Sequence, residues 1–167
     1  MRFVSIIIGS KSDYDVMKEC GKTLEKFGVP YELIISSAHR SPERTKNYIK
    51  DAESRGAVVF IAAAGMAAHL AGAVAATTIK PVIGVPMSSS DLRGEDALLS
   101  TVMMPAGMPV ATLAIGKAGA INSAYLAMQI LAIDDDELKV KLTEDRLAKA
   151  KKVETDSAEI EVLIDNR

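Results

Sequence analysis

Five short apolar runs rich in β-branched residues recur along this chain, and segments of helix length separate each run from the next. Within a run the apolar residues are continuous, which is typical of strands that are buried on both faces of a parallel sheet. A parallel sheet needs right-handed crossovers, and these place helices on both of its faces. The sequence therefore predicts an α/β fold with a central parallel five-stranded sheet, whose strands are Phe3 to Ile8, Tyr31 to Ile35, Val58 to Ala62, Val82 to Val85 and Val110 to Leu113.

The segments between the runs carry helix signals. After the first run, apolar residues recur three, four and three positions apart and form one helix face, which consists of Met17, Cys20, Leu24 and Phe27. Gly28 and Pro30 then stop this helix, because glycine favours the turn that ends a helix and proline cannot continue one. A second helix is expected to have Ser41 as its N-cap and Pro42 at its first position, and to end near Arg55.

The overall composition limits the classes of function. A chain of 167 residues with 49% hydrophobic residues fits one domain with a full core. With a net charge of −2, the chain lacks the excess of cations that marks nucleic-acid binding, so we expect no nucleic-acid partner. Cys20 is the only cysteine, which excludes an internal disulfide and, with only two histidines, argues against a structural zinc site. The N-terminal apolar stretch is too short for a secretory signal, so we expect a reducing, cytoplasmic location.

One stretch raises the alternative of a membrane span. Residues 57–79 contain no Asp, Glu, Lys or Arg, and these 23 residues are long enough to cross a bilayer. However, Gly65 separates a β-branched run from an alanine-rich run, and His69 lies midway. A buried strand, a turn and a buried helix fit this pattern better, so we expect no membrane contact.

Charge is distributed unevenly along the chain. Residues 57–133 hold only six of the 42 charged residues (20 basic, 22 acidic), which predicts that this region is unusually buried. Residues 118–133 are apolar nearly all round, which predicts a helix buried in a substantial homo-oligomer interface. Residues 134–167 are charge-dense with leucines at helical spacing, so they should form one or two peripheral helices that fray at the end. We therefore expect a catalytic domain at 1–133 and a peripheral helical extension of the same domain at 134–167.

Polar segments follow three of the predicted strands, at the edge where ligands bind in open parallel sheets. The first segment is GSKSD, Gly9 to Asp13, where glycine permits a tight turn and free amides would accommodate a phosphate. The alternative is that Ser10 and Ser12 only cap a helix, since each has an aspartate three residues further on.

Each of the other two segments holds one of the two histidines. In SSAHR, residues 36–40, His39 offers a proton carrier that titrates near neutrality, and Arg40 offers a fixed cation for a phosphate or carboxylate. In AAAGMAAHLAG, residues 62–72, small residues would let a ligand approach the backbone beside His69. Either histidine could instead satisfy a structural contact, and Arg40 could simply be solvated. Together, the three segments predict one polar pocket on an apolar scaffold.

Several common site motifs are missing from the sequence. There is no P-loop, no complete dinucleotide fingerprint after the first strand, and no acidic residue at the end of the third strand for a phosphoacceptor. Cys20 and the serines are not accompanied by a convincing catalytic triad. Acid/base chemistry without a cofactor, on a small phosphorylated molecule, is the class of function that remains.

At these segments the sequence closely resembles class I of the PurE family. The resemblance covers about Val4 to Leu131 and rests on long motifs in the order and spacing of the family, including GSKSDYDVM, SAHRSPE, AGMAAHLAG and KPVIGVPMSSSDLRGEDALL. It implies a flavodoxin-like three-layer α/β/α subunit that assembles as a homo-octamer. It also implies the reaction of N5-carboxyaminoimidazole ribonucleotide mutase in purine biosynthesis, which moves a carboxylate from the exocyclic N5 to C4 without a metal or organic cofactor.

The resemblance implies roles for eight residues. His39 would be the general acid/base, which protonates the departing nitrogen as CO2 leaves and later takes the C4 proton. Gly65 and His69 would line the region of the base and CO2. Within the phosphate and ribose site, Asp13 would suit the ribose hydroxyls and Arg40 an anionic group. That site would consist of Ser10, Ser12, Asp13, Ser37 and Arg40.

The chain departs from the family pattern at the second glycine-rich loop. Many members read AGGAAHLPG, whereas here Met66 replaces a glycine and Ala71 the proline, which predicts a loop rim of different shape or stiffness. Class II members, which carboxylate aminoimidazole ribonucleotide with CO2 directly, look like SAHK and AGRSN at these loops, so Arg40 and AGMAAHL favour class I. Direct carboxylation and a non-catalytic nucleotide-sensing module remain the two alternatives.

Overall fold

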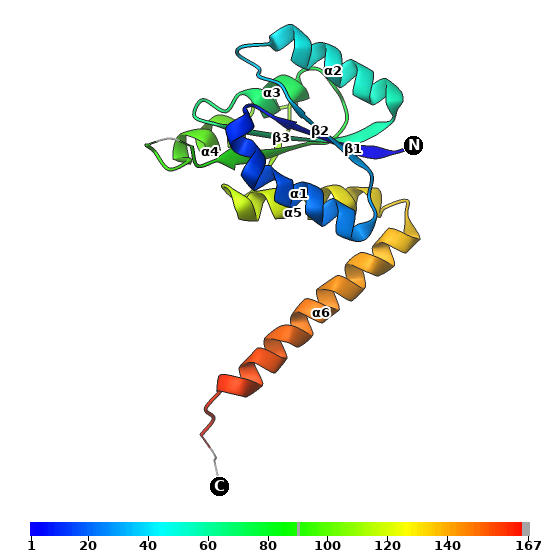
Figure 1. Ribbon diagram of the computed structural model, residues 1–167, viewed down its shortest axis with the longest axis vertical. Helices are drawn as coiled ribbons and strands as arrows, with labels where there is room; N and C mark the ends of the chain where they lie inside the picture. The colour runs from blue at the N-terminus through cyan, green and yellow to red at the C-terminus, as the bar shows by residue number, and fades with distance from the viewer. Residues whose placement is uncertain (90, 165–167) are drawn as a thin grey trace. The chain divides into compact units, whose positions relative to one another are not determined.

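The computed structural model describes residues 1–89 and 91–164, and it contains a sheet with the strand order β2-β1-β3-β4-β5 (Figure 1). The strands are β1 (Phe3–Ile8), β2 (Tyr31–Ile35), β3 (Ala57–Gly65), β4 (Val82–Met87) and β5 (Ala111–Thr112). All neighbouring strands are parallel, so the predicted parallel five-stranded sheet is confirmed. The bounds of β1 and β2 agree with the prediction, whereas β3 and β4 are longer than predicted and β5 is shorter.

Helices cover both faces of this sheet. Figure 1 shows α2 and α3 on one face, with α1 and α5 on the other. The fold is therefore a flavodoxin-like three-layer α/β/α sandwich, as predicted. Its helices are α1 (Tyr14–Phe27), α2 (Pro42–Arg55), α3 (Leu70–Ala75), α4 (Glu95–Val102) and α5 (Lys117–Leu131), and a short 3-10 helix, η1 (Lys11–Asp13), precedes α1.

The ends of α1 and α2 lie where the sequence predicted them, but Ser41 does not cap α2 as expected. Gly28 and Gly56 both have left-handed backbone conformations, with φ of 74° and 111°, and they terminate α1 and α2. Ser41 lies at the N-cap position of α2, but its side chain makes no cap hydrogen bond. Instead, Ser41 Oγ accepts from Ser37 N at 3.0 Å and donates to Ser37 O at 3.1 Å. The predicted N-cap therefore closes the loop before α2 rather than capping the helix.

Burial follows the position of each strand in the sheet. Every residue of β1 and β4 is buried, as the continuous apolar runs predicted. Every residue of β2 is at least partly exposed, because β2 is an edge strand that has a neighbour on one side only. The prediction of two-sided burial is therefore right for the central strands and wrong for this edge.

The core on the α2 and α3 side contains large apolar side chains from the sheet and both helices. Phe60 from β3 and Ile7 from β1 are fully buried there. They pack in one cluster with Ile49 of α2 and with Leu70 and Val74 of α3. Full burial of one such side chain stabilises a fold by about 1.5–3 kcal/mol, so this cluster holds the two helices on the sheet.

On the opposite face, α5 buries its small residues within the chain. Ala120, Ala124 and Ala127 are fully buried, and Ser123 Oγ lies 3.5 Å from Cys20 Sγ of α1. Small side chains let α5 pack closely against α1. Part of the apolar character of α5 is therefore explained by packing within the chain. Burial raises the pKa of the Cys20 thiol to about 11, so this thiol is protonated at neutral pH.

The charge-free stretch at 57–79 forms β3, a turn and α3, as expected. Over residues 1–89 and 91–164, no helix has both the length and the apolarity that crossing a membrane requires.

The chain divides into two compact units, of which the first is Met1–Ile130 and the second begins at Leu131. Up to residue 164 the second unit contains one long helix, α6 (Asp136–Ile160), where one or two helices were predicted. Asp135 Oδ1 accepts from Leu138 N at 2.9 Å and caps its start. Ion pairs between side chains four residues apart, such as Lys141 to Glu137 at 2.7 Å, line the helix. Residues 161–164 are not helical, and the predicted frayed end also includes residues 165–167, which lie outside the described part of the chain.

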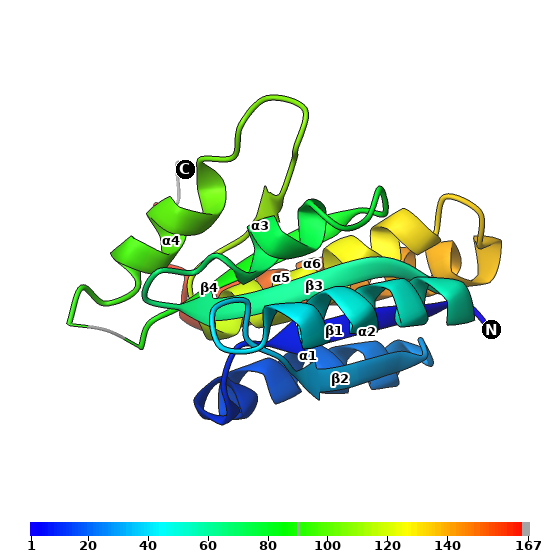
Figure 2. The same cartoon turned by 90° about the horizontal axis from the view of Figure 1, so that it is seen from above.

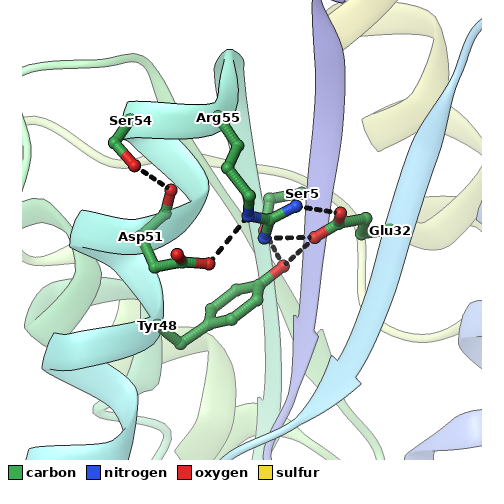
Figure 3. Close-up of polar contacts among 6 residues, drawn as sticks. All are labelled: Ser5, Glu32, Tyr48, Asp51, Ser54 and Arg55. Carbon is green, nitrogen blue, oxygen red and sulfur yellow. Dashed lines mark hydrogen bonds and ion pairs between the residues drawn. The ribbon is translucent and has the colours of Figure 1, made fainter.

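A polar cluster ties α2 to the edge strand β2 (Figure 3). Arg55 donates to both carboxylate oxygens of Glu32, and its Nε donates to Asp51 Oδ2 at 2.7 Å. Tyr48 donates to Glu32 Oε2 at 3.2 Å and lies 2.9 Å from Ser5 Oγ. The Arg55 guanidinium lowers the pKa of Glu32, so the bidentate pair is ionised at neutral pH. The segment that carries His39 connects β2 to α2. The cluster therefore holds together the two elements at the ends of that segment.

Candidate functional site

The candidate site is a pocket of about 550 Å³ at the carboxyl ends of four strands. The chain runs from β1 to β2 on one side and then returns to β3 on the other, so strand order reverses at β1. This is the position at which open parallel sheets bind ligands. In Figure 2 the loops after β1, β2 and β3 lie together at one end of the sheet. The structure brings all eight predicted site residues to the wall of this pocket, namely Ser10, Ser12, Asp13, Ser37, His39, Arg40, Gly65 and His69.

The loop after β1 presents two hydroxyl groups. Ser10 is the N-cap of η1, and its Oγ accepts from Ser12 N at 3.4 Å and from Ser12 Oγ at 3.1 Å. The capping alternative therefore holds for Ser10, over two residues rather than three. Ser12 makes no cap and is exposed. Ser10 is the acceptor in both of its hydrogen bonds with Ser12, so its own hydroxyl hydrogen can be donated to a ligand.

Asp13 is the buried acid of the pocket. Only 4% of its surface is exposed, and burial raises the pKa of its carboxyl above the ordinary value. A carboxylate that has lost much of its water is a strong acceptor for donors that a ligand brings. Its position at the end of η1, directly before α1, holds it at the pocket wall.

The segment after β2 is fixed by hydrogen bonds within itself. Ser37 Oγ accepts from Arg40 N at 3.1 Å, while Ser36 Oγ lies 2.7 Å from Thr45 Oγ1 of α2 and is buried. These bonds leave the hydroxyl hydrogen of Ser37 available and hold the backbone on both sides of His39. The side chains of His39 and Arg40 remain exposed toward solvent.

The two histidines contact each other directly. His39 Nε2 lies 2.8 Å from His69 Nδ1, and the rings meet edge to face with centroids 4.8 Å apart. One ring must donate and the other accept, so the pair shares one proton between the facing nitrogens. If His39 gains a second proton, its Nε2–H still donates to a neutral His69, and the bond persists in the acid form. The pair therefore supports His39 in both of its protonation states.

The loop after β3 places His69 at the start of α3. The backbone N of His69 donates to Ala67 O at 2.9 Å, which tightens the turn. The ring of His69 contacts the ring of His39 rather than a buried backbone carbonyl. His69 therefore does not make the structural contact that was the alternative to a role in the site.

Similarity to known proteins identifies the family of the chain. The profile of the AIR carboxylase family matches residues 3–152. The chain belongs to the AIR carboxylase family. Its relatives include N5-carboxyaminoimidazole ribonucleotide mutase of Pyrococcus horikoshii, which is 53% identical over 158 residues, covering 95% of this chain and 88% of the relative. The mutase of Brucella melitensis is 50% identical over 150 residues, covering 90% of this chain and 93% of that protein.

A solved structure has the same fold. The crystal structure of Treponema denticola PurE superposes with a TM-score of 0.88 at 27% sequence identity, covering 97% of this chain and all of that one. The predicted family and fold are therefore confirmed. Among residues 1–89 and 91–164, no group of three or more His, Cys, Asp or Glu side chains is arranged to hold a metal ion.

Further residues of the pocket wall in this AIR carboxylase family member were not predicted as site residues. Ser89 is the polar one, and it follows the carboxyl end of β4. The signal that could have found it is positional, because a serine run directly after a fourth parallel strand lies at the same edge as the other three loops. The remaining unpredicted lining residues are small or apolar, namely Gly9, Ala38, Ala64, Met66, Ala67 and Leu70.

The two departures from the family pattern lie in different surroundings. Met66 is 60% exposed at the pocket and has a φ of 57°, in the left-handed region. Ala71, by contrast, lies in α3 and is buried in the core, so it is not part of the loop rim on which the prediction placed it. Position 71 is in the first turn of α3, where the missing N–H of a proline costs no helix hydrogen bond.

We predict that Met66→Gly raises the free energy of unfolding by about 0.5–1 kcal/mol, because a Cβ disfavours the left-handed conformation and glycine does not. Denaturant unfolding measures the change. Met66→Ala is the matched control, since it shortens the side chain but keeps the Cβ. An equal gain in both variants would assign the effect to the exposed side chain rather than to the backbone.

Proposed function

We propose that the protein is an N5-carboxyaminoimidazole ribonucleotide mutase, which converts this carbamate to 4-carboxy-5-aminoimidazole ribonucleotide in purine biosynthesis. Relatives of that name share 53% and 50% identity with the chain and align over nearly all of it. The single observation that carries the chemistry is the His39–His69 pair, with its facing nitrogens 2.8 Å apart at the wall of the pocket.

In the proposed reaction His39 moves one proton twice. As the N–CO2 bond breaks, its electron pair returns to the exocyclic nitrogen, and protonated His39 gives that nitrogen a proton. C4 of the ring then attacks the released CO2, and a C–C bond forms. Neutral His39 takes the proton from C4, which restores the aromatic ring and the starting state of the enzyme. No electron is gained or lost overall, so the reaction needs no redox cofactor. Because His39 supplies the acid and the base, we propose that no metal or organic cofactor takes part.

The polar residues of the loops after β1 and β2 are proposed to hold the nucleotide by its phosphate and ribose. The hydroxyl hydrogens of Ser10 and Ser37 would donate to the phosphate oxygens, Ser12 would turn its hydroxyl from Ser10 to the same group, and the Arg40 guanidinium would pair with the phosphate charge. The buried Asp13 carboxylate would accept from the ribose hydroxyls. This leaves the heterocycle to lie toward Gly65 and His69, beside the proton carrier.

The assay that tests the proposal is the conversion of synthetic N5-carboxyaminoimidazole ribonucleotide, followed spectroscopically with purified protein. We expect turnover without added metal or cofactor. Turnover of aminoimidazole ribonucleotide at modest bicarbonate, with the carbamate left untouched, would instead establish direct carboxylation. Nucleotide binding without any turnover would establish a sensing module.

We further propose that the chain assembles as a homo-oligomer, an octamer by its resemblance to the PurE family, in the cytoplasm. Ile121, Leu126 and Ile130 of α5 remain partly exposed in the chain, which supports a partner on this helix. Residues 1–133 would form the catalytic domain and residues 134–167 its helical extension. Light scattering should report a mass several times 17.8 kDa. A stable monomer at micromolar concentration would contradict the assembly but not the chemistry.

A further inference from the structure

Ser89 lies in close contact with Gly65. A Cβ built on Gly65 would come within 1.8 Å of Ser89 Oγ and 3.1 Å of Ser89 Cβ. The hydroxyl group of Ser89 therefore occupies the space that any side chain at position 65 would take. Gly65 does not have a left-handed backbone, so the need for glycine here comes from this contact rather than from φ.

The hydroxyl group of Ser89 is available to a ligand. Ser89 is exposed and lines the pocket. Within residues 1–89 and 91–164, its side chain makes no hydrogen bond to another residue. A hydroxyl that is held in place by packing and still has its hydrogen to donate is suited to an oxygen atom of a bound molecule.

Strand order places Ser89 at the far end of the pocket from the proposed phosphate site. The loops after β2 and β1 carry Ser37, Arg40 and Asp13, and β4 lies two strands beyond β1, on the side of β3. Adjacent strands are about 4.8 Å apart, so about 10 Å separates β1 from β4. A nucleotide anchored by its phosphate near β1 would therefore direct its heterocycle toward Gly65 and Ser89.

We propose that Ser89 holds the migrating carboxyl group of the substrate, an inference that rests on the mutase function proposed above. Its Oγ–H donates to one carboxyl oxygen before the N–C bond breaks, retains CO2 beside C4, and donates to the same oxygen as negative charge returns with the new C–C bond. Ser89 keeps its proton throughout, and His39 carries the only proton that moves. Gly65 positions Ser89 by leaving room for its hydroxyl group.

The test is the retention of CO2 during turnover, measured by running the conversion in [13C]bicarbonate. In the wild-type protein the carboxyl group should transfer with little label in the product. In Ser89→Ala we expect kcat to fall about tenfold and KM to change by less than about threefold, because a single donor to the reacting group is lost. The labelled fraction of the product and the amount of released aminoimidazole ribonucleotide should each rise at least about fivefold, because CO2 then escapes more often.

Ser88→Ala is the matched control, since Ser88 is exposed on the same segment and does not line the pocket. It should behave as the wild-type protein does. Gly65→Ala should reproduce the leakage of Ser89→Ala, because its Cβ displaces the hydroxyl group, and the double variant should add little to either single change. Ser89→Cys, which keeps the shape but is a weak donor, gives the same readout if Ser89→Ala fails to fold.

Three outcomes would overturn the proposal for Ser89. The first is that Ser89→Ala and Ser89→Cys keep the wild-type kcat and the wild-type retention of CO2. The second is that Ser88→Ala loses as much CO2 as Ser89→Ala does. The third is that the wild-type protein itself exchanges its carboxyl group fully with the labelled bicarbonate. A wild-type protein that leaves the carbamate unconverted is a different result, since it contradicts the mutase function itself.

Discussion

His39→Asn should lower kcat for conversion of N5-carboxyaminoimidazole ribonucleotide by about 10²–10⁴-fold, since positioned acid/base catalysis contributes an effect of that size. Asparagine keeps a polar side chain of similar length but cannot carry a proton between two atoms of the substrate. KM should change far less, because the phosphate and ribose contacts are assigned to other residues. Steady-state kinetics with the synthetic carbamate measures both constants.

His69→Gln gives the comparison that separates proton transfer from positioning. His39 loses its partner at 2.8 Å in this variant but keeps its own ring. We therefore expect a smaller loss of kcat than in His39→Asn, because His69 positions the ring of His39 whereas His39 itself carries the proton. Activity within about tenfold of wild type in His39→Asn would contradict the acid/base role.

Asp13→Asn should raise KM for the nucleotide about 10–100-fold while making the ligand-free protein more stable at neutral pH. The loss of affinity follows because a hydrogen bond to a charged acceptor is worth about 1.5–3 kcal/mol. The gain in stability follows because burial raises the pKa of Asp13, which means that its ionised form is costly in the folded state. Substrate kinetics and denaturant unfolding report the two effects separately.

The pH dependence of that stability gain has a definite sign. The folded-state pKa of Asp13 lies above the ordinary value of 3.8, so the ionised carboxyl lowers the wild-type unfolding free energy at every pH above the folded-state pKa. As pH falls through the folded-state pKa toward 3.8, the carboxyl becomes protonated and the difference between the proteins should shrink. Asp15→Asn is a useful control, since Asp15 is exposed and pairs with Lys18 at 2.7 Å. A gain in Asp13→Asn that persists unchanged at low pH would contradict a charge effect.

Local signals in the chain predicted most of the elements. The helix α1 ends at Gly28 and α2 begins at Pro42, because the backbone preferences of glycine and proline act at the residue itself. Strands β1 and β2 agree with their apolar runs. At β5 the prediction was longer than the strand, since only two residues pair with β4 and the pairing depends on that neighbour.

Two residues lie in surroundings that differ from the predicted ones. Ser41 was expected to cap α2, yet its hydroxyl group bonds to Ser37 because the loop folds back on itself. Ala71 was expected on a loop rim, yet it is buried because α3 packs into the core there. Ser41 thus follows a contact within its own loop, whereas the burial of Ala71 depends on how α3 packs into the core.

The pattern of apolar runs was enough to predict the parallel sheet. The polar residues that follow three of those runs predicted the three loops at its carboxyl edge and the two histidines in them. The bond between His39 and His69, thirty residues apart, depends on β1 lying between β2 and β3. The contact of Ser89 with Gly65 depends likewise on β4 lying beside β3. Strand neighbours are chosen by packing over the whole domain, so no local pattern of residues specifies which side chains meet across the pocket.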